Sequence, residues 1–369
     1  MLSPIPQLNR ASRLLFFAPH PDDESLAGGG LLQKAAAAGA AIEVICVTNG
    51  DDNPWPLRLM ERQWKIDSTD HALWGLRRMQ ETLDALCTLG LARNCVQFLN
   101  LPDQQLTRLL LQETALVRQL REIIRRMSPT LLVGPTPNDR HPDHSALSVL
   151  LELALNDRSL PPLRRLAYAV HTRGHSGNDD AVAFSLNRDE QETKRRAVLC
   201  HRSQMLLSRR RFLRHVRDRE EFWAPAPPCE MSPEHSVIAG RFEDGSLHLQ
   251  LRRQKRTGTF ARCSLQIVGE TDEQEQLRWE LQLPGRSTNV EVRAANGLPV
   301  GAQAAVQIRG AHAAVQLPLA HFGRPQGIFV KLKEPTLFFD RSGWREIPVR
   351  LDRTLEKSTE RSAAFTAHD

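Results

Sequence analysis

Two short segments of the sequence combine imidazole and carboxylate side chains at a spacing that suits a metal site. The first is His20-Pro21-Asp22-Asp23-Glu24, and the second is His141-Pro142-Asp143-His144. Each segment follows a short apolar run, at residues 14–17 and 131–133, and each precedes a helix-like stretch. In an open parallel α/β sheet, the loops after neighbouring strands meet at one crevice. Histidine and carboxylate ligands that leave one position for water are typical of a hydrolytic zinc site.

The two segments resemble the signatures of the PIG-L/LmbE family of zinc-dependent de-N-acetylases, an A-H-P-D-D-E-like loop and an H-P-D-H-like loop. Here the first loop has Pro19 added before the histidine, and the second is unchanged. Further segments match in order and extend the resemblance over residues from about 12 to 225: Thr48-Asn49-Gly50, Arg78-Met79-Gln80-Glu81 and a helix from Lys194 to Gln204. The resemblance implies a Rossmann-like, doubly wound, mostly parallel sheet. It also implies a zinc-dependent hydrolase that removes an N-acetyl group from an N-acetylglucosamine-containing glycan, glycolipid or sugar conjugate.

The same resemblance assigns the metal ligands to His20, Asp23 and His144, with one Zn²⁺ per chain. Asp22 and Asp23 are neighbours, so their side chains diverge in an extended turn. One carboxylate can then bind the metal while the other faces the water. We therefore predict that Asp22 is the general base.

The proline of the second segment predicts how its two histidines are placed. Pro at a first helical position makes His141 the N-cap and puts His144 in the first turn, on the same side of the helix. His141 is then predicted to stand beside the metal without binding it. A protonated imidazole there would stabilise an oxyanion and protonate the leaving amine. Asp143 is predicted to hold the ring of His141 and to raise its pKa.

Other residues near the two segments are predicted to contact the substrate or to support the fold. Asn49 and Asp51 follow a strand, in a loop where the resemblance implies substrate-facing residues. Arg78 matches a family arginine near the sugar pocket, although a surface pair with Glu81 at i+3 is an equal alternative. Glu24 is predicted to have a structural role, and the glycines at 28–30 are predicted to allow close packing of a helix on the sheet.

Three alternatives remain open at the level of sequence. Either segment alone is also compatible with a surface turn, since Pro and Asp favour turns, or with a carboxylate cluster that complements a helix dipole. An amidase of the same mechanism on another N-acylated small molecule is the nearest alternative function. A non-catalytic carbohydrate-binding or scaffold protein is the other, and the intact His and Asp set argues against it.

Composition and charge narrow the class of protein. The chain has 369 residues, which predicts two domains, and its 41% hydrophobic and 25% charged residues are typical of a globular protein. No apolar run reaches the length of a membrane span, and residues 1–12 lack the pattern of a signal peptide, so we expect a cytoplasmic enzyme. The six cysteines have no paired spacing, which favours free thiols and no structural zinc.

The net charge is +6, and its densest basic run lies at residues 209–217. Such a run is most often a solvated helix face, although it can also contact a phosphate-bearing partner. An anionic amino-sugar substrate is favoured over nucleic acid. The oligomeric state is left open.

The pattern of elements predicts two domains joined by a linker. Strand-like segments at 13–17, 42–47, 96–99 and 131–133 alternate with helix-like segments, so residues 1–225 are predicted to form the deacetylase-like domain. Residues 53–75, with Trp55, Trp64 and Trp74, are interpreted as a rim over the site or as packing anchors.

The second half of the chain has a residue pattern that predicts strands rather than helices. Residues 226–235 are predicted to form a Pro-rich linker and residues 236–352 an antiparallel β-sandwich of short strands and unknown role. Residues 353–369 are predicted to form a disordered tail. The expected sandwich core includes five aromatic residues, Trp279, Phe329, Phe338, Phe339 and Trp344. Carbohydrate binding, a partner protein and self-association are equal alternatives for its role.

Overall fold

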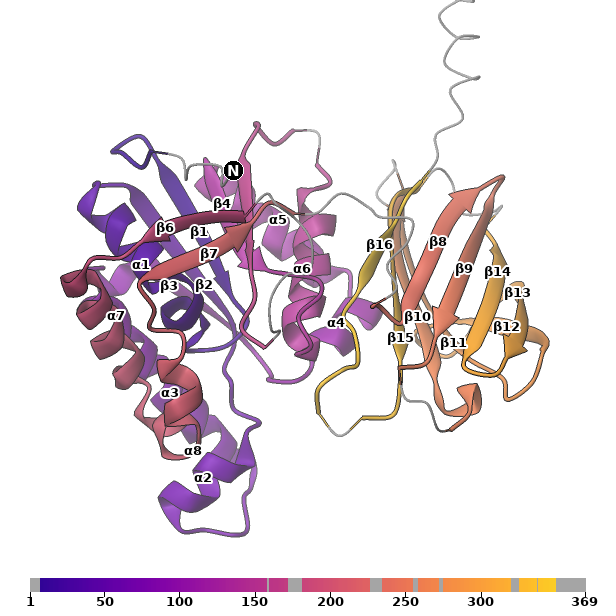
Figure 1. The fold of residues 1–369 in the computed structure, drawn as a ribbon, viewed down its shortest axis with the longest axis horizontal. Coiled ribbons are helices and arrows are strands. Elements are labelled where there is room, and N and C mark those ends of the chain that lie inside the picture. The colour runs from indigo at the N-terminus through magenta and orange to yellow at the C-terminus, as the bar shows by residue number, and fades with distance from the viewer. Residues whose placement is uncertain are drawn as a thin grey trace, which may run out of the picture. The chain divides into compact units, whose positions relative to one another are not determined.

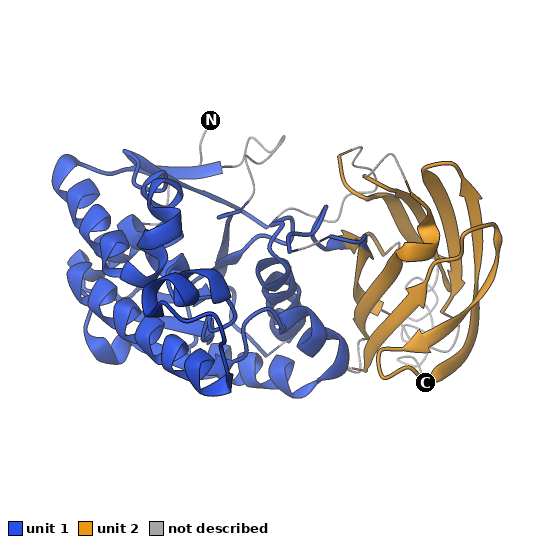
Figure 2. Ribbon diagram, turned by 90° about the horizontal axis from the view of Figure 1, so that it is seen from below, with its two compact units in different colours: residues 1–227, 333–345 blue, residues 228–332, 346–369 orange. Residues whose placement is uncertain are grey.

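A computed structural model of the chain describes residues 7–157, 159–171, 181–225, 234–254, 258–271, 275–319, 325–336 and 338–349. Figure 2 shows its two compact units, one of residues 1–227 and 333–345 and the other of residues 228–332 and 346–369. Unit 1 thus contains residues 333–345, here called the return segment, which sequence analysis assigned to the β domain. The predicted linker is described only at residues 234–235, and the predicted tail lies outside the described residues.

The sheet of unit 1 has the strand order β3-β2-β1-β4-β5-β7-β6 (Figure 1). Five of its strands are parallel: β1 (Arg13–Ala18), β2 (Ala41–Thr48), β3 (Val96–Leu101), β4 (Leu131–Pro135) and β5 (Arg164–Tyr168). Two antiparallel strands follow at one edge, β7 (Arg219–Trp223) and β6 (Ala181–Ser185). The strand order reverses beside β1, so the carboxyl ends of β1 and β4 border the crevice where such sheets bind ligands. The predicted mostly parallel α/β sheet is confirmed.

Helices cover both faces of this sheet (Figure 1), which is why β1 is apolar along its length. One layer contains α1 (Asp23–Ala37), α3 (Ser68–Thr88) and α7 (Arg188–Cys200), and the other contains α4 (Leu106–Gln112), α5 (Ala115–Met127) and α6 (Pro142–Leu155). Two helices, α2 (Pro54–Glu61) and α8 (Arg202–Leu213), and the 3₁₀ turn η1 (Arg93–Cys95) complete unit 1. A Cβ on Gly28 would lie 2.4 Å from the Phe16 ring, which confirms close packing of α1 on the sheet.

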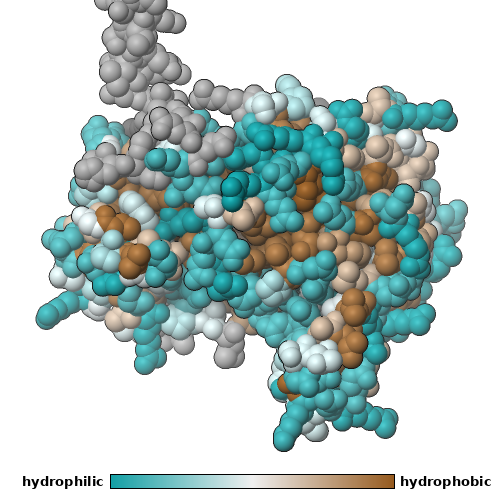
Figure 3. All heavy atoms as spheres, turned by 180° about the vertical axis from the view of Figure 1, so that it is seen from behind, coloured by the Kyte–Doolittle hydropathy of each residue, from teal (hydrophilic) through white to brown (hydrophobic). Residues whose placement is uncertain are grey.

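The tryptophans of residues 53–75 have different surroundings. Trp74 on α3 is 1% exposed and packs in the interior, whereas Trp55 and Trp64 are 57% and 77% exposed. Figure 3 shows hydrophobic side chains on the projecting part of the surface around α2. Trp74 is therefore a packing anchor, and Trp55 and Trp64 belong to the surface.

Unit 2 is built on one sheet with the strand order β16-β15-β10-β11-β12-β13-β14-β9-β8. The strands are β8 (Val237–Glu243), β9 (Ser246–Arg252), β10 (Ser264–Thr271), β11 (Gln276–Gln282), β12 (Thr288–Ala294), β13 (Pro299–Arg309), β14 (His312–Pro318), β15 (Pro325–Lys333) and β16 (Arg345–Ile347), with the 3₁₀ turn η2 at Phe260–Arg262. Pairing from β10 through to β8 is antiparallel, as predicted, but the strands form one sheet and not the two packed sheets of the predicted sandwich. The sheet curls until β8 meets the segment after β16, through a bridge between Phe242 and Val349.

The core of unit 2 differs from the predicted one in its aromatic residues. Leucine, valine and isoleucine side chains make up most of it, Phe260 is buried among them, and Trp279 packs at its edge. Phe338, Phe339 and Trp344 are not part of it, because they lie in the return segment of unit 1. Among the described helices, none is long and apolar enough to cross a lipid bilayer.

Candidate functional site

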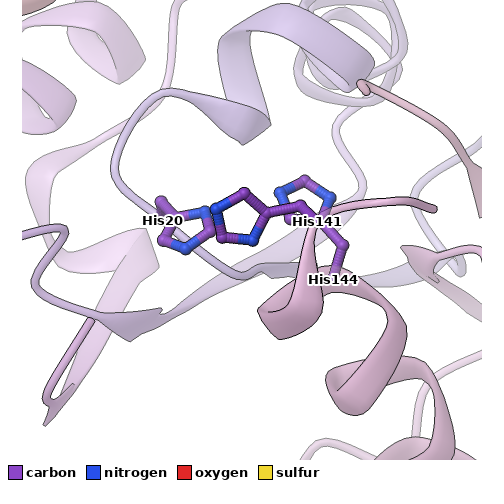
Figure 4. A group of neighbouring side chains, drawn as sticks. All are labelled: His20, His141 and His144. Carbon is purple, nitrogen blue, oxygen red and sulfur yellow. The ribbon is translucent and has the colours of Figure 1, made fainter. Parts of the chain in front are cut away.

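Segments that follow the parallel strands of unit 1 meet at one cluster of histidine and aspartate side chains, all of them buried except the half-buried His171. The segment after β1 supplies His20, Asp22 and Asp23, and the segment after β3 supplies Asp103. The segment after β4 supplies Asp139, His141, Asp143 and His144, and the segment after β5 supplies His171. Figure 4 shows the rings of His20, His141 and His144 side by side near the start of α6. The His20 ring centroid lies 4.6 Å from that of His141 and 5.3 Å from that of His144.

The structure brings together the three predicted ligands. Oδ2 of Asp23 lies 3.3 Å from Nδ1 of His20 and 3.2 Å from Nε2 of His144. Asp23 is 1% exposed and His144 is fully buried, so water does not compete for these atoms. Two imidazole nitrogens and one carboxylate oxygen are donor types of a zinc site. Among the described residues, the groups whose ligand atoms all lie within 4.8 Å of one another are His20, His141 and His144; Asp23, His144 and His171; and His20, Asp103 and Asp143.

Two observations show that these residues fit a divalent cation. First, both ring nitrogens of His144 are buried, yet no group of the described residues donates to or accepts from them with hydrogen-bond geometry. Second, burial alone would lower the pKa of His144, but the Asp23 and Asp139 carboxylates outweigh it and raise the pKa to about 9. The cluster therefore favours positive charge at this point, which a divalent cation also supplies.

Carboxylates also surround the outer ring nitrogen of each histidine that is predicted to bind the metal. Nε2 of His20 lies 3.1 Å from Oδ1 of Asp103 and 3.3 Å from Oδ2 of Asp143. Nδ1 of His144 lies 3.3 Å from Oδ2 of Asp139. A carboxylate on the outer nitrogen fixes the orientation of a metal-binding imidazole and raises its basicity.

Asp22 has a strained backbone beside this cluster. It is the N-cap of α1 with φ of 133°, a conformation that non-glycine residues rarely adopt. Its backbone N–H donates to Oε2 of Glu24 at 3.0 Å, and its carboxylate accepts from Nη2 of Arg78 at 2.7 Å. Burial raises the pKa of Asp22 to about 6, although the positive charge of Arg78 opposes the shift. Glu24 has the predicted structural position, since it is fully buried and holds this turn.

Arg78 joins two of the converging loops. Besides Asp22, its guanidinium donates to the carbonyls of Gly50 and Pro21, each at 2.6 Å. A Cβ on Gly50 would lie 2.0 Å from Nη1 of Arg78, so the contact requires glycine. The alternative pair with Glu81 does not form, because Glu81 instead accepts from the backbone and hydroxyl of Ser203.

The other predicted substrate contacts lie in the loop after β2. Oδ1 of Asp51 accepts from the backbone N–H of Asp103 at 3.1 Å, which ties this loop to the one after β3. Oδ1 of Asn49 is buried and has no hydrogen-bond partner among the described residues. Substrate contact by Asn49, Asp51 and Arg78 stays a prediction.

The predicted relation between Asp143 and His141 is wrong. His141 is the N-cap of α6 as predicted, but its Nδ1 accepts from the backbone N–H of Asp143 at 3.2 Å. The Asp143 carboxylate points away, toward His20, and accepts from the backbone N–H groups of Gln104 and Leu106. Burial, together with the charges of His20 and His144, lowers the pKa of His141 well below its usual range. The expected rise in its pKa is therefore also wrong.

Sequence analysis did not find Asp103, Asp139 and His171. Asp103 follows a predicted strand at 96–99, whose carboxyl end was a usable signal. Asp139 stands two residues before His141, and it accepts from the backbone N–H groups of His141, Val170 and His171. His171 follows β5, a strand that was not predicted, and could bind one cation together with Asp23 and His144.

The return segment adds two aromatic rings to the site. The ring centroids of Phe338 and Phe339 lie 5.0 and 5.9 Å from that of His141, and Phe339 lies 5.4 Å from His171. Phe338 is 41% exposed even though it contacts this buried histidine. No sequence signal indicated that a segment after the β strands would reach the site.

Comparison with known proteins found one family model that matches part of the chain. Residues 15–155 match the family model PIG-L, described as GlcNAc-PI de-N-acetylase. The comparison with curated proteins gave no match.

Several solved structures are also similar to this chain. A conserved protein from Thermus thermophilus is 26% identical, with 60% of this chain and 98% of that one covered and a TM-score of 0.44. A triple mutant of a deacetylase of the teicoplanin biosynthetic pathway is 23% identical (58% and 97% covered, TM-score 0.46). The N,N'-diacetylchitobiose deacetylase of Pyrococcus horikoshii is 22% identical (57% and 83% covered, TM-score 0.46).

Proposed function

We propose that this chain is a zinc-dependent hydrolase that removes the N-acetyl group from an N-acetylglucosamine-containing substrate, because its residues 15–155 match the PIG-L family model. The observation that carries this proposal is the position of the Asp23 carboxylate, within 3.3 Å of a ring nitrogen of both His20 and His144. These three residues would hold the metal. When bound, zinc supplies a Lewis acid for the amide carbonyl and lowers the pKa of water.

Asp22 is the general base in this proposal. Its carboxylate stands next to the ligand set, and Arg78 holds it in place. Asp22 accepts a proton from the attacking water as the new C–O bond forms at the carbonyl carbon. When the C–N bond breaks, that proton passes to the departing nitrogen, so that acetate and a free amine result.

His141 stabilises the oxygen that gains negative charge during the attack. Its Nδ1 accepts a backbone hydrogen bond, so the proton of a neutral ring lies on Nε2. An imidazole N–H fixed in this way is a preorganised donor for an oxyanion. Asn49, Asp51 and Arg78 remain proposed substrate contacts.

Elemental analysis and acetate release test the proposal together. The purified protein is expected to hold zinc and to release acetate from N-acetylglucosamine conjugates. Amides without a sugar serve as the comparison, because a higher rate on those would favour the amidase alternative. Absence of both bound metal and acetate release would favour a binding or scaffold protein.

A further inference from the structure

A cavity of about 1090 Å³ adjoins the candidate site within unit 1. On the side of the site its lining includes Tyr168, His171 and Phe339, and both His171 and Phe339 contact the ring of His141. Its remaining lining comes largely from α8, the turn after α8 and β7. Ligand pockets commonly measure about 300–1,000 Å³, so the space exceeds what one sugar ring needs.

The lining of this cavity has an excess of positive charge. Two of its cations are neutralised: Lys194 pairs with Glu220 at 2.6 Å, and Arg219 pairs with Glu221. Four arginines also line it, Arg140, Arg211, Arg214 and Arg217. Within the described part of the chain, none of these four forms an ion pair with a carboxylate. Asp218 is the one further acidic residue among the described lining residues.

The positive charges around the cavity also affect the pKa of a neighbouring histidine. His215 lines the same cavity. Burial and then the charges of Lys194 and Arg217 lower the pKa of His215 to about 4. The part of this shift that comes from Lys194 and Arg217 reflects positive charge around the cavity, which also attracts an anion.

The basic run at residues 209–217 divides between two environments. Arg211, Arg214 and Arg217 are spaced three apart and line the cavity, whereas Arg209 and Arg210 are not among its described lining residues. Residues three apart share one side of a helix or turn. The spacing of the run thus directs part of it toward the cavity.

We propose that this cavity binds a phosphate group carried by the amine-bearing half of the substrate. The inference rests on the proposed function: the acetyl group ends after two carbons, so anything that extends from the site into the cavity belongs to the other half. Guanidinium groups bind phosphate oxygens through paired, charge-assisted hydrogen bonds. The phosphate ester can belong to a nucleoside diphosphate or to a lipid headgroup, since both present the same oxygens.

The test compares two substrates that differ in one charged group, N-acetylglucosamine 1-phosphate and methyl N-acetylglucosaminide. The readout is the ratio of their kcat/KM values for acetate release. In Arg214→Gln/Arg217→Gln this ratio is expected to fall by about tenfold or more, the loss expected for hydrogen bonds to a charged group. The matched control is Arg209→Gln/Arg210→Gln, which removes the same amount of charge from the same basic run and is expected to keep the ratio.

The outcomes separate the inference from the proposed function. Hydrolysis of both substrates with no preference for the phosphate, or an equal loss in the control variant, would overturn the cavity assignment and leave the deacetylase proposal intact. If neither substrate is hydrolysed, calorimetric binding of inorganic pyrophosphate decides: binding that is lost only in Arg214→Gln/Arg217→Gln supports the cavity, and equal binding by both variants refutes it. A nucleoside diphosphate sugar and a phosphatidylinositol glycoside in vesicles then identify the source of the phosphate by their relative rates.

Discussion

Asp22 and Asp23 are adjacent and have the same side chain, yet they have different surroundings. Asp23 faces two histidine nitrogens, whereas Asp22 faces Arg78. We expect Asp22→Asn to retain zinc and to lower kcat by about 10²–10⁴, the range for loss of a general base. Asp23→Asn should lose the metal itself, because it removes one of three ligands. Bound zinc and kcat are measured in parallel.

The control for these two variants is Asp84→Asn, the same change at a surface carboxylate of α3. It should leave both readouts unchanged. Metal loss in Asp22→Asn together with metal retention in Asp23→Asn would reverse the assignment of the two carboxylates.

The Asp143 carboxylate contacts His20, a proposed metal ligand, rather than the ring of His141. Its carboxylate lies 3.3 Å from Nε2 of His20, so Asp143→Asn should weaken metal affinity by about 10–100-fold, as is usual for such outer carboxylates. His141→Gln should instead retain the metal and lose turnover. Titration of each variant with zinc gives the affinity. An unchanged affinity in Asp143→Asn would contradict this role.

At the scale of elements, one buried ion pair links α1 and α7 to β7, the strand beside the edge strand β6. The carboxylate of Glu220 accepts from Lys194 at 2.6 Å and from the backbone N–H groups of Gly30 and Leu31. Glu220→Gln leaves the buried Lys194 without its counter-charge, which should cost about 3 kcal/mol of unfolding free energy. Urea unfolding measures the loss.

The neighbouring residue provides the control. Glu221 pairs with Arg219 at the surface, so Glu221→Gln should cost less than about 1 kcal/mol. Equal losses of unfolding free energy in the two variants would show that the buried Lys194–Glu220 pair stabilises the fold no more than the surface pair does.

At the scale of the whole molecule, the chain leaves unit 2 and returns to complete the site. The backbone N–H groups of Asp340 and Trp344 donate to the carbonyls of Arg140 and Pro137, at 2.9 and 3.0 Å. A Cβ on Gly343 would lie 1.8 Å from the Pro137 carbonyl oxygen, so Gly343→Ala must displace the segment. We expect kcat/KM to fall by up to about 100-fold, the effect of misplacing a site by about 1 Å, while bound zinc stays constant.

Gly285→Ala in unit 2 is the matched control, because its added Cβ would meet only ordinary contacts at 3.5 Å or more. It should not change kcat/KM. Full activity in Gly343→Ala would show that Phe338 and Phe339 have no part in the reaction.

The sequence alone determined what depends on neighbours along the chain. His20, Asp23 and His144 could be predicted to meet because each follows a strand of a parallel sheet, and parallel strands end at one edge. Pro142 made His141 an N-cap, and the glycines at 28–30 predicted close packing of α1, because both effects are local.

Only the tertiary structure decided which groups from distant parts of the sequence contact the side chains of the site. Asp143 contacts His20, Gln104 and Leu106, and no spacing along the chain indicates the direction of its carboxylate. Phe338 and Phe339 reach His141 because the chain doubles back after strands β8 to β15 of another unit. Such contacts depend on side-chain directions and on the packing of segments far apart in sequence, and local propensity and periodicity contain no information about either.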